Sequence, residues 1–517
     1  MPVIAMKGAP ELNAARDAPD LEEVKWWTLP NMRKLYFWAA VLCIASATTG
    51  YDGMMLNTSQ NLDEWQLYFD EPTGSKLGLM NAIYMIGSIV GFLPVPFLAD
   101  RYGRRLPIAI GCVFMILGGC LGAFCNNYGM YVGGRLILGF GNSLAQMASP
   151  VLLTEICHPQ HRAKVTTIYN CLWNLGALVV AWIAWGTMEI KNDWSWRSIT
   201  LLQIGPAVIQ LTFIYWVPES PRWFIAQERH DEALSILAYY HAEGDAQNPT
   251  VQFEFQEIKE TLRLEMEYAR TSSYLDFLRT RGNRYRLMLL ISQGLISQYS
   301  GNALFSNYTN LIYTSMGFTE QSQKIPLNGG QTLVSLIFSV SAAFFVDRVG
   351  RRPLFLSATA GMFFMFLAWT ITSSQYERTG HVSAAYPQVV FIYLFNMFYS
   401  LAWSGLLVAY SLEILPYKLR AKGLLIMNMT VQSILVLSNQ TNPIAWDNMP
   451  QNWNLSAFYT CWIAVEFVFV YFFYVETKGP TLEELAKIFD GDEAAVGEVD
   501  IKKIEEHIIH TDEKPAA

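Results

Sequence analysis

Two charged side chains lie inside apolar stretches of the chain, where they could bind and release a proton. Asp52 stands in the first apolar stretch and Arg135 stands in the fourth. Placing an ionised side chain in hydrocarbon costs several kcal/mol, so we expect each of these two residues to have a function. We expect the two side chains to pair, and a proton on Asp52 would then remove its charge and release Arg135. A plain salt bridge between two helices is the structural alternative.

A set of charged residues occurs twice in the same order. Residues 100–105 read Asp-Arg-Tyr-Gly-Arg-Arg and residues 347–352 read Asp-Arg-Val-Gly-Arg-Arg, an offset of 247 (347 − 100). Further along, Glu155 with Arg162, and then Glu219, recur at similar offsets. Their counterparts are Glu413, Arg420 and Glu476. Three similar offsets in one order indicate two duplicated halves, an arrangement typical of membrane transporters.

Long apolar runs must position these residues. The chain has 517 residues, of which 52% are hydrophobic and only 15% charged, against about 25% charged in soluble domains. A membrane-spanning helix needs about 20 apolar residues, and we find twelve suitable runs. They lie at about 35–56, 77–99, 106–125, 130–154, 165–187, 198–217, 287–315, 330–346, 354–373, 387–412, 423–445 and 456–475. We predict an all-α membrane protein with twelve transmembrane helices in two six-helix pseudo-symmetric halves.

Basic loops predict the orientation and the domain boundaries. Arginines cluster at residues 101–105, 279–286 and 348–352, and positively charged loops stay cytoplasmic, so both termini are expected inside. The predicted segments are a cytoplasmic tail at 1–34, the first half at 35–217, a cytoplasmic helical linker at 218–286, the second half at 287–475 and a cytoplasmic tail at 476–517. Within the linker, Asp231–His241 and Phe253–Arg270 predict amphipathic helices.

Composition excludes several classes of protein. The formal net charge is −8, and no basic field exists to attract nucleic acid. The 7 cysteines form no CxxC pair, so we expect free thiols and no metal site. No nucleophile–base pairing or phosphate loop is found. We therefore expect no enzyme activity and no cofactor.

The motifs resemble those of the sugar porter family of the major facilitator superfamily. The resemblance rests on the two DRxGRR motifs, on GRLILG at 134–139, on PESPR at 218–222 and on ETKG at 476–479, and it covers residues 35–490. Within the family the chain looks closest to fungal lactose permeases, on the residues at 170–176, 194–197, 297–302, 327–330 and 413–417.

The resemblance implies roles for the charged residues. It makes Asp52, with Arg135, the proton site of a symporter, a site that facilitative carriers of the family often lack. It also implies networks that latch the cytoplasmic side in the outward-facing state. The residues of these networks are Asp100, Arg101, Arg104, Glu155, Arg162, Glu219, Arg222, Asp347, Arg348, Arg351, Glu413, Arg420 and Glu476. Basic loops that only fix orientation are the alternative reading.

The resemblance further implies a sugar site near the membrane midplane, between the halves. Its candidate residues are Asn170, Gln298, Asn302, Asn307, Ser335, Trp403 and Gln432. Amides would bond the hydroxyls and an aromatic ring would face the C–H surface. The family often has glutamine at position 297 and asparagine at 335, where this chain has serine. The shorter side chains suit a larger ligand or a non-sugar, and each amide could instead join two helices.

We therefore expect a plasma-membrane carrier, working as a monomer, that moves a sugar by alternating access with protons as a partner. The sugar would be a hexose or a β-linked disaccharide such as lactose or cellobiose. The alternatives are a facilitative sugar carrier, a carrier of a polyol, quinate-like acid or secondary metabolite, and a non-transporting nutrient sensor. Asn57 and Asn454 begin glycosylation sequons in expected outer loops.

Overall fold

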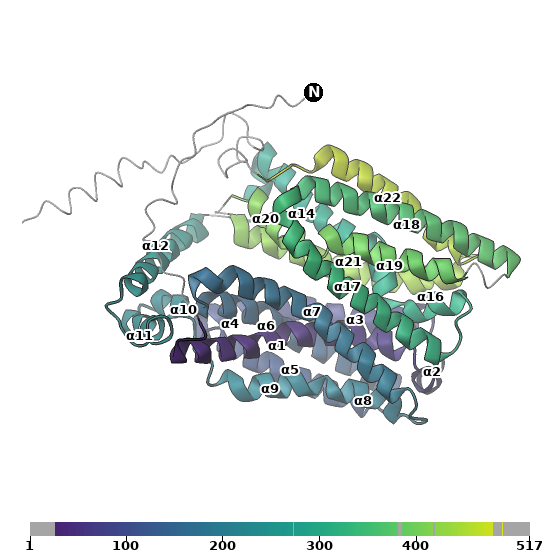
Figure 1. The fold of residues 1–517 in the computed structure, drawn as a ribbon, viewed down its shortest axis with the longest axis horizontal. Helices are drawn as coiled ribbons and strands as arrows, with labels where there is room; N and C mark the ends of the chain where they lie inside the picture. The colour runs from purple at the N-terminus through teal and green to yellow at the C-terminus, as the bar shows by residue number, and fades with distance from the viewer. Residues whose placement is uncertain (1–25, 272, 381–384, 417–418, 479–488, 490–517) are drawn as a thin grey trace, which may run out of the picture.

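The computed structural model describes residues 26–271, 273–380, 385–416, 419–478 and 489. Within these ranges the chain is helical and contains no strand. The long helices form two groups, one below the other in Figure 1. The lower group consists of α1 (Pro30–Ser59), α2 (Asp63–Phe69), α3 (Gly74–Phe92), α4 (Val95–Tyr102), α5 (Arg105–Ala123), α6 (Tyr128–Ile156), α7 (Pro159–Thr187), α8 (Trp194–Leu202) and α9 (Ile204–Ile214).

The upper group in Figure 1 follows a linker of shorter helices. The linker holds α10 (Pro221–Ala226), α11 (His230–His241), α12 (Pro249–Thr271) and α13 (Asp276–Arg279). The upper group consists of α14 (Arg281–Tyr299), α15 (Asn302–Asn307), α16 (Thr309–Ser315), α17 (Gln321–Val349), α18 (Arg351–Thr379), α19 (Ala385–Ala402), α20 (Leu406–Ile414), α21 (Arg420–Asn448) and α22 (Trp453–Phe473). The two groups meet where α3 packs on α21 and α7 packs on α17.

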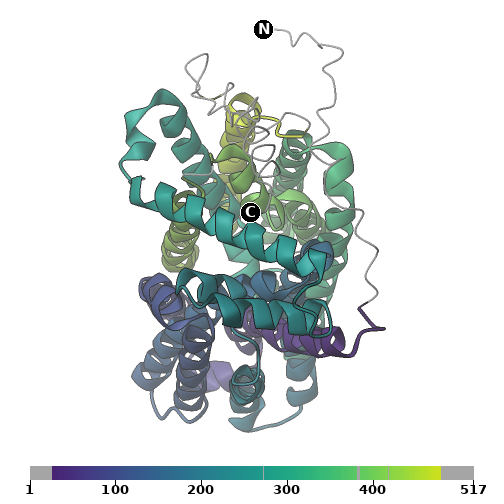
Figure 2. The same ribbon diagram turned by 90° about the vertical axis from the view of Figure 1, so that its left-hand side faces the viewer.

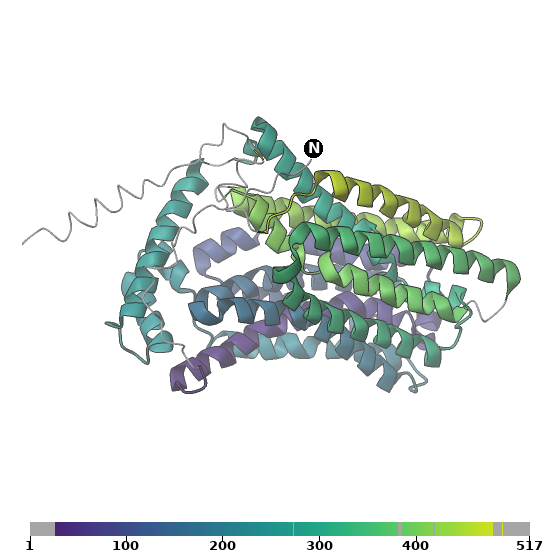
Figure 3. The same cartoon turned by 45° about the horizontal axis from the view of Figure 1, so that its top comes forward.

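The linker helices gather at one end of the molecule. Figure 3 shows α12 standing apart from the long helices at that end. In Figure 2, α12 crosses the border between the lower and the upper group. Below, this end is called the linker end, and the opposite one the far end. The sequence-predicted segments 231–241 and 253–270 coincide with α11 and with most of α12.

Among the described residues, nine helical segments are long and apolar enough to cross a membrane. The predicted runs 287–315, 330–346 and 423–445 do not reach this threshold. The first is broken, because α14 ends at Tyr299 and Gly301 takes a φ of 91°. In the other two, α17 and α21 carry many amides and hydroxyls, which lower their hydropathy. Several of these polar residues, such as Gln331 and Asn428, face a cavity inside the protein.

Glycines bring α1 and α7 into backbone contact. A Cβ atom added at Gly50 would lie 1.8 Å from the carbonyl oxygen of Trp173, and one added at Gly176 would lie 1.9 Å from that of Ala47. Small residues at such crossings let helices approach closely in lipid, where packing replaces the hydrophobic effect as the driving force. The contact fixes how α7 presents its cavity-facing side chains.

Candidate functional site

A cavity of about 480 Å³ lies between the two groups of helices. It receives side chains from α1, α3, α6 and α7 on one side and from α14, α15, α17, α19, α20 and α21 on the other. Its polar lining is made of amides and hydroxyls: Ser46, Thr49, Gln146, Tyr169, Asn170, Asn174, Gln298, Asn302, Ser306, Asn307, Gln331, Thr332, Ser335, Asn396, Tyr399, Ser400, Ser404 and Asn428. None of the described lining residues carries a charged side chain. Such a surface suits an uncharged solute rich in hydroxyl groups.

The structure brings most of the sequence-predicted binding residues together. Six of the seven candidates line the cavity, namely Asn170, Gln298, Asn302, Asn307, Ser335 and Trp403. Asn302 donates to Gln298 at 3.5 Å across the bend at Gly301, and Ser306 donates to Asn302 at 3.3 Å. Gln432 is not among the lining residues, and its Oε1 is buried without a hydrogen bond to any described group.

Other lining residues escaped the sequence analysis. Asn174 and Gln331 line the same cavity, as does Trp173. The signal for Asn174 was available, because it lies four positions after Asn170 on the same helix face. Trp403, in contrast, borders the cavity but is 0% exposed, and its Nε1 already donates to Thr359 at 3.1 Å.

Asp52 and Arg135 are neighbours, but they do not form the expected side-chain pair. Asp52 is 0% exposed, and neither of its carboxylate oxygens has a hydrogen-bond partner among the described residues. Nη1 of Arg135 reaches the backbone carbonyl of Asp52 at 3.5 Å, and its guanidinium lies 4.9 Å from the centre of the Tyr84 ring. The pairing prediction is therefore wrong for this conformation, since Arg135 is held by a carbonyl and a ring.

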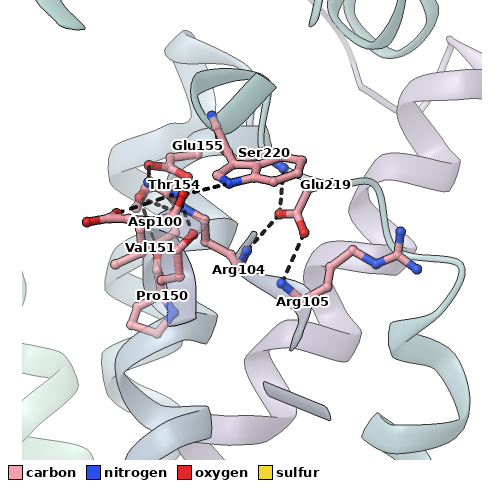
Figure 4. A network of polar contacts seen from close by, with 11 residues as sticks. Asp100, Arg104, Arg105, Pro150, Val151, Thr154, Glu155, Glu219 and Ser220 are labelled. Carbon is pink, nitrogen blue, oxygen red and sulfur yellow. Dashed lines mark hydrogen bonds and ion pairs between the residues drawn. The ribbon is translucent and has the colours of Figure 1, made fainter. Parts of the chain in front are cut away.

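Charged residues converge at the linker end of the lower group (Figure 4). Arg104 pairs with Glu155 at 3.0 Å and lies 3.9 Å from Asp100. The carboxylate of Glu219 accepts the backbone N–H groups of Arg104 and Arg105 at 3.0 and 3.2 Å, at the start of α5. An acid at a helix amino terminus satisfies unpaired donors and the helix dipole. The network thus joins α4, α5, α6 and the start of the linker.

The upper group repeats this network. Arg351 pairs with Glu413 at 2.9 Å. Glu476 accepts the backbone N–H groups of Arg351 and Arg352 at 3.0 and 3.1 Å, at the start of α18. The side chains of Asp347 and Arg348 lie outside the described part of the chain. The duplicated motif therefore builds the same contact twice.

Four further arginines belong to the predicted networks, and the structure shows contacts outside these networks for three of them. Arg162 lies 3.8 Å from Glu254 on α12 instead of pairing with Glu155. Arg101 is exposed, and its guanidinium lies 5.8 Å from the Tyr102 ring. Arg420 donates to the carbonyl of Leu415 at 3.4 Å, and Arg222 is half-buried in α10.

At the far end, hydrogen bonds join the two groups directly. Oδ1 of Asn57 accepts from the backbone N–H and the hydroxyl of Thr309 at 3.0 and 2.8 Å, and Nδ2 of Asn57 donates to Asn328 at 3.2 Å. We call Asn57, Thr309 and Asn328 the amide gate. All three are buried, so the gate ties the two groups of helices together at the far end. The hydrogen bonds that join described residues of the two groups all lie at this end.

The amide gate corrects the glycosylation prediction at Asn57. Its side chain is 0% exposed and its Nδ2 is engaged with Asn328, so no glycan fits there. Asn454, at the start of α22, is half-buried, and its glycosylation stays a prediction.

Replacing Asn57 by Ala is expected to open the far end. The change removes three buried hydrogen bonds of the gate, at about 1 kcal/mol each, which corresponds to at least a tenfold shift of population. In a cysteine-depleted background carrying Ser306→Cys, an impermeant maleimide added at the far end should then react about tenfold faster. Asn448→Ala is the matched control, because Asn448 bonds only the carbonyl of Ile444 in its own helix. Equal labelling rates in the two variants would contradict the gate.

Comparison with known proteins identifies the fold. The family described as "Sugar (and other) transporter" matches residues 38–489. The chain belongs to the sugar transporter family. It is 29% identical over 449 residues to the MFS-type transporter criB of Aspergillus cristatus, covering 85% of this chain and 90% of that protein. It is 25% identical over 480 residues to a high-affinity glucose transporter of Kluyveromyces lactis, covering 89% and 86%.

A plant relative and a solved structure extend the comparison. The probable polyol transporter 3 of Arabidopsis thaliana is 28% identical over 479 residues, covering 89% of this chain and 92% of that protein. An inward open conformation of the xylose transporter XylE from E. coli matches with a TM-score of 0.72 and 21% identity, covering 88% of this chain and all of that one. As a sugar transporter family member, the chain is a multi-pass membrane protein and not an enzyme.

A buried cluster fastens the linker of this sugar transporter family member to the lower group. His241 on α11 places Nδ1 2.7 Å from Glu254 on α12 and Nε2 3.1 Å from the carbonyl oxygen of Ile156. The ring of His241 thereby bridges α12 and the end of α6. The ring centre of His158 lies 5.2 Å from that of His241. The described residues contain no group of three or more that could hold a metal.

This cluster predicts that acid loosens the linker. Burial, together with the nearby His241, lowers the pKa of His158 to about 4 from 6.5. A histidine with the ordinary pKa in the undocked state binds its proton first, so docking is fully stable above pH 6.5 and weakens as the pH falls towards 4. Protection factors for hydrogen exchange in α11 and α12, which remove the intrinsic pH dependence of exchange, should fall several-fold between pH 7 and pH 5, and His158→Asn should reduce this change. His230→Asn, on α11, is the control; an unchanged pH profile in His158→Asn would refute the assignment.

Proposed function

We propose that this chain carries a neutral, polyhydroxylated solute, most plainly a sugar, across the plasma membrane by alternating access. The observation that carries the proposal is the cavity between the two groups of helices, lined by amides and hydroxyls without a charged side chain. Amides donate and accept at once, which matches hydroxyl groups that do the same. The size of the cavity, about 480 Å³, lies within the range of small-molecule sites and leaves room for a disaccharide such as lactose or cellobiose.

The residues that line the cavity also favour some of the alternative solutes over others. A relative that is 24% identical is a quinate permease of Neurospora terricola, and a carboxylate needs a cation or several strong donors once it leaves water. No lysine or arginine is among the described lining residues, which favours a sugar or polyol over a quinate-like acid. No feature of the cavity favours a non-transporting sensor over a carrier.

Two observations support proton coupling through Asp52. Its carboxyl group is buried beside the cavity-lining Gly53 and has no donor among the described residues. Burying an ionised carboxylate without a donor costs far more than burying a neutral acid, so the observed arrangement fits an Asp52 that carries its proton. Loss of the proton would recruit the guanidinium of Arg135, which already reaches the Asp52 carbonyl, and would shift α1 against α6.

The proposal assigns an orientation and a topology. The linker end is cytoplasmic, with both termini, and the far end faces outside. In this assignment twelve spans form two six-helix halves, where the three spans that fall below the hydropathy threshold are α14–α16, α17 and α21. The closed amide gate and the xylose transporter match support an inward-facing conformation. The two networks at the linker end would then bond across the halves in the outward-facing state, and we propose that the monomer is the functional unit.

An uptake panel tests the function. Transport-deficient yeast expressing the chain would be given labelled lactose, cellobiose, glucose, xylose, a polyol and quinate, with and without a protonophore. We expect uptake of at least one sugar and its collapse with the protonophore. Sugar uptake that persists would leave a facilitative carrier. Uptake of quinate alone, or no uptake by protein shown to reach the surface, would overturn the proposal.

A further inference from the structure

We propose that Trp173 is the surface on which the ring of the solute stacks, and that Trp403 only borders the site. The inference rests on the proposed function and deepens it, because it names the residue and the solute geometry that decide selectivity.

Trp173 lies on the face of α7 that lines the cavity. Asn170, Trp173, Asn174 and Ala177 occupy one face of the helix, at intervals of three and four residues, and all four line the cavity. The indole is thus flanked by two amides on its own helix. An aromatic face beside planar hydrogen-bonding groups can bind the C–H surface of a sugar ring while its hydroxyls are bonded at the rim.

The side chain of Trp173 is more accessible to a solute than that of Trp403. Trp173 is 37% exposed, whereas Trp403 is 0% exposed. Among the described residues no hydrogen bond engages Nε1 of Trp173, while Nε1 of Trp403 donates to Thr359 at 3.1 Å. The ring of Trp403 is also packed against Phe355, with the ring centres 4.8 Å apart. Only Trp173 therefore has both its face and its N–H group free to meet a solute.

Helix α1 lies next to the indole of Trp173 and helps to hold its position. A Cβ atom added at Gly53 of α1 would lie 3.6 Å from Cζ2 of Trp173, so the indole lies over Gly53, which has no side chain to crowd it. The close crossing at Gly50 and Gly176 fixes α7 at the same height. A rigid platform loses little freedom when the solute binds, which favours affinity. Gly53, over which the indole lies, directly follows Asp52 in the sequence.

The geometry assigns a solute class. A pyranose ring has a flat patch of C–H groups that an indole can cover, with hydroxyls around its edge. An acyclic polyol of the same size has the hydroxyls but no flat ring. The chain should therefore prefer pyranosides over acyclic polyols, and the preference should depend on Trp173.

The test compares substitutions at the two tryptophans. KM and Vmax for a labelled pyranose would be measured for the wild type, Trp173→Phe, Trp173→Leu and Trp403→Phe, with each variant normalised to the amount of protein at the surface. We expect Trp173→Leu to raise KM about tenfold with little change in Vmax. Trp173→Phe, which keeps an aromatic face, should restore KM to within about threefold, and the preference for pyranose over polyol should fall only in Trp173→Leu.

Three results would overturn the inference. An unchanged KM in Trp173→Leu would remove the platform while leaving the sugar carrier intact. A fall in Vmax alone, equal in the Phe and Leu variants, would show a packing role. A larger rise of KM in Trp403→Phe than in Trp173→Leu would return the role to Trp403. Wild-type protein at the surface that transports no sugar or polyol would overturn the proposed function itself, a result distinguishable from the other three.

Discussion

Replacing Asp52 by Asn is expected to abolish concentrative uptake of the solute while leaving exchange of labelled for unlabelled solute intact. The amide keeps the size of the side chain but cannot take up or release a proton. In proteoliposomes with an imposed pH gradient, accumulation of solute above its external concentration should fall at least about a hundredfold, to the level of equilibration. The measurement is the ratio of inside to outside solute at steady state.

Glu466 provides the matched control for this prediction. It is also a buried acid in a helix, α22, and neither carboxylate oxygen has a partner among the described residues. It is not among the residues that line the cavity and it lies in the other half. Glu466→Gln should therefore keep accumulation near the wild-type level. Wild-type accumulation in Asp52→Asn would contradict the assignment of the proton site.

Replacing Gly176 by Ala is expected to destabilise the folded protein. The new methyl group would lie 1.9 Å from the carbonyl oxygen of Ala47, and neither backbone can yield without separating α1 from α7. Overpacking of a core costs about 1–3 kcal/mol and occasionally more, and here the opposing atom is backbone. We expect the melting temperature in detergent to fall by about 5 °C or more, with loss of the monodisperse peak in size-exclusion chromatography.

Gly186 on the same helix is the control for Gly176. Nothing lies within 4 Å of a Cβ added there, and alanine is a better helix former than glycine by about 1 kcal/mol. Gly186→Ala should therefore leave the melting temperature unchanged or raise it. Equal melting temperatures for the two variants would show that α1 and α7 do not depend on the close crossing.

The sequence predicted the helical class, the repeated networks and six of the residues that line the cavity because these depend on local signals. The duplicated charged motifs lie at helix ends, where a carboxylate can satisfy free N–H groups, so Glu219 and Glu476 were predictable. The linker helices followed from their amphipathic pattern. Asn302 followed from its spacing to Gln298, since i and i+4 positions share a face.

The misplaced residues depend on contacts between distant segments. Arg162 turns to Glu254 of the linker, and Asn57 is buried by residues more than 200 positions later. The exchange of roles that we propose for the tryptophans has the same cause: Trp403 contacts Phe355 and Thr359, whereas Gly53 on another helix leaves space for Trp173. No single-sequence pattern reports which face of a helix such partners will cover.

The central claim is that a neutral solute and a proton cross together. It is tested most directly by recording current from proteoliposomes on a solid-supported membrane when a pyranose is added without a pH gradient. A neutral sugar carries no charge, so co-transport with a proton predicts a transient inward current of positive charge that Asp52→Asn lacks and that Trp173→Leu shifts to higher sugar concentration. Entry of labelled pyranose into the same vesicles without any current would contradict the account.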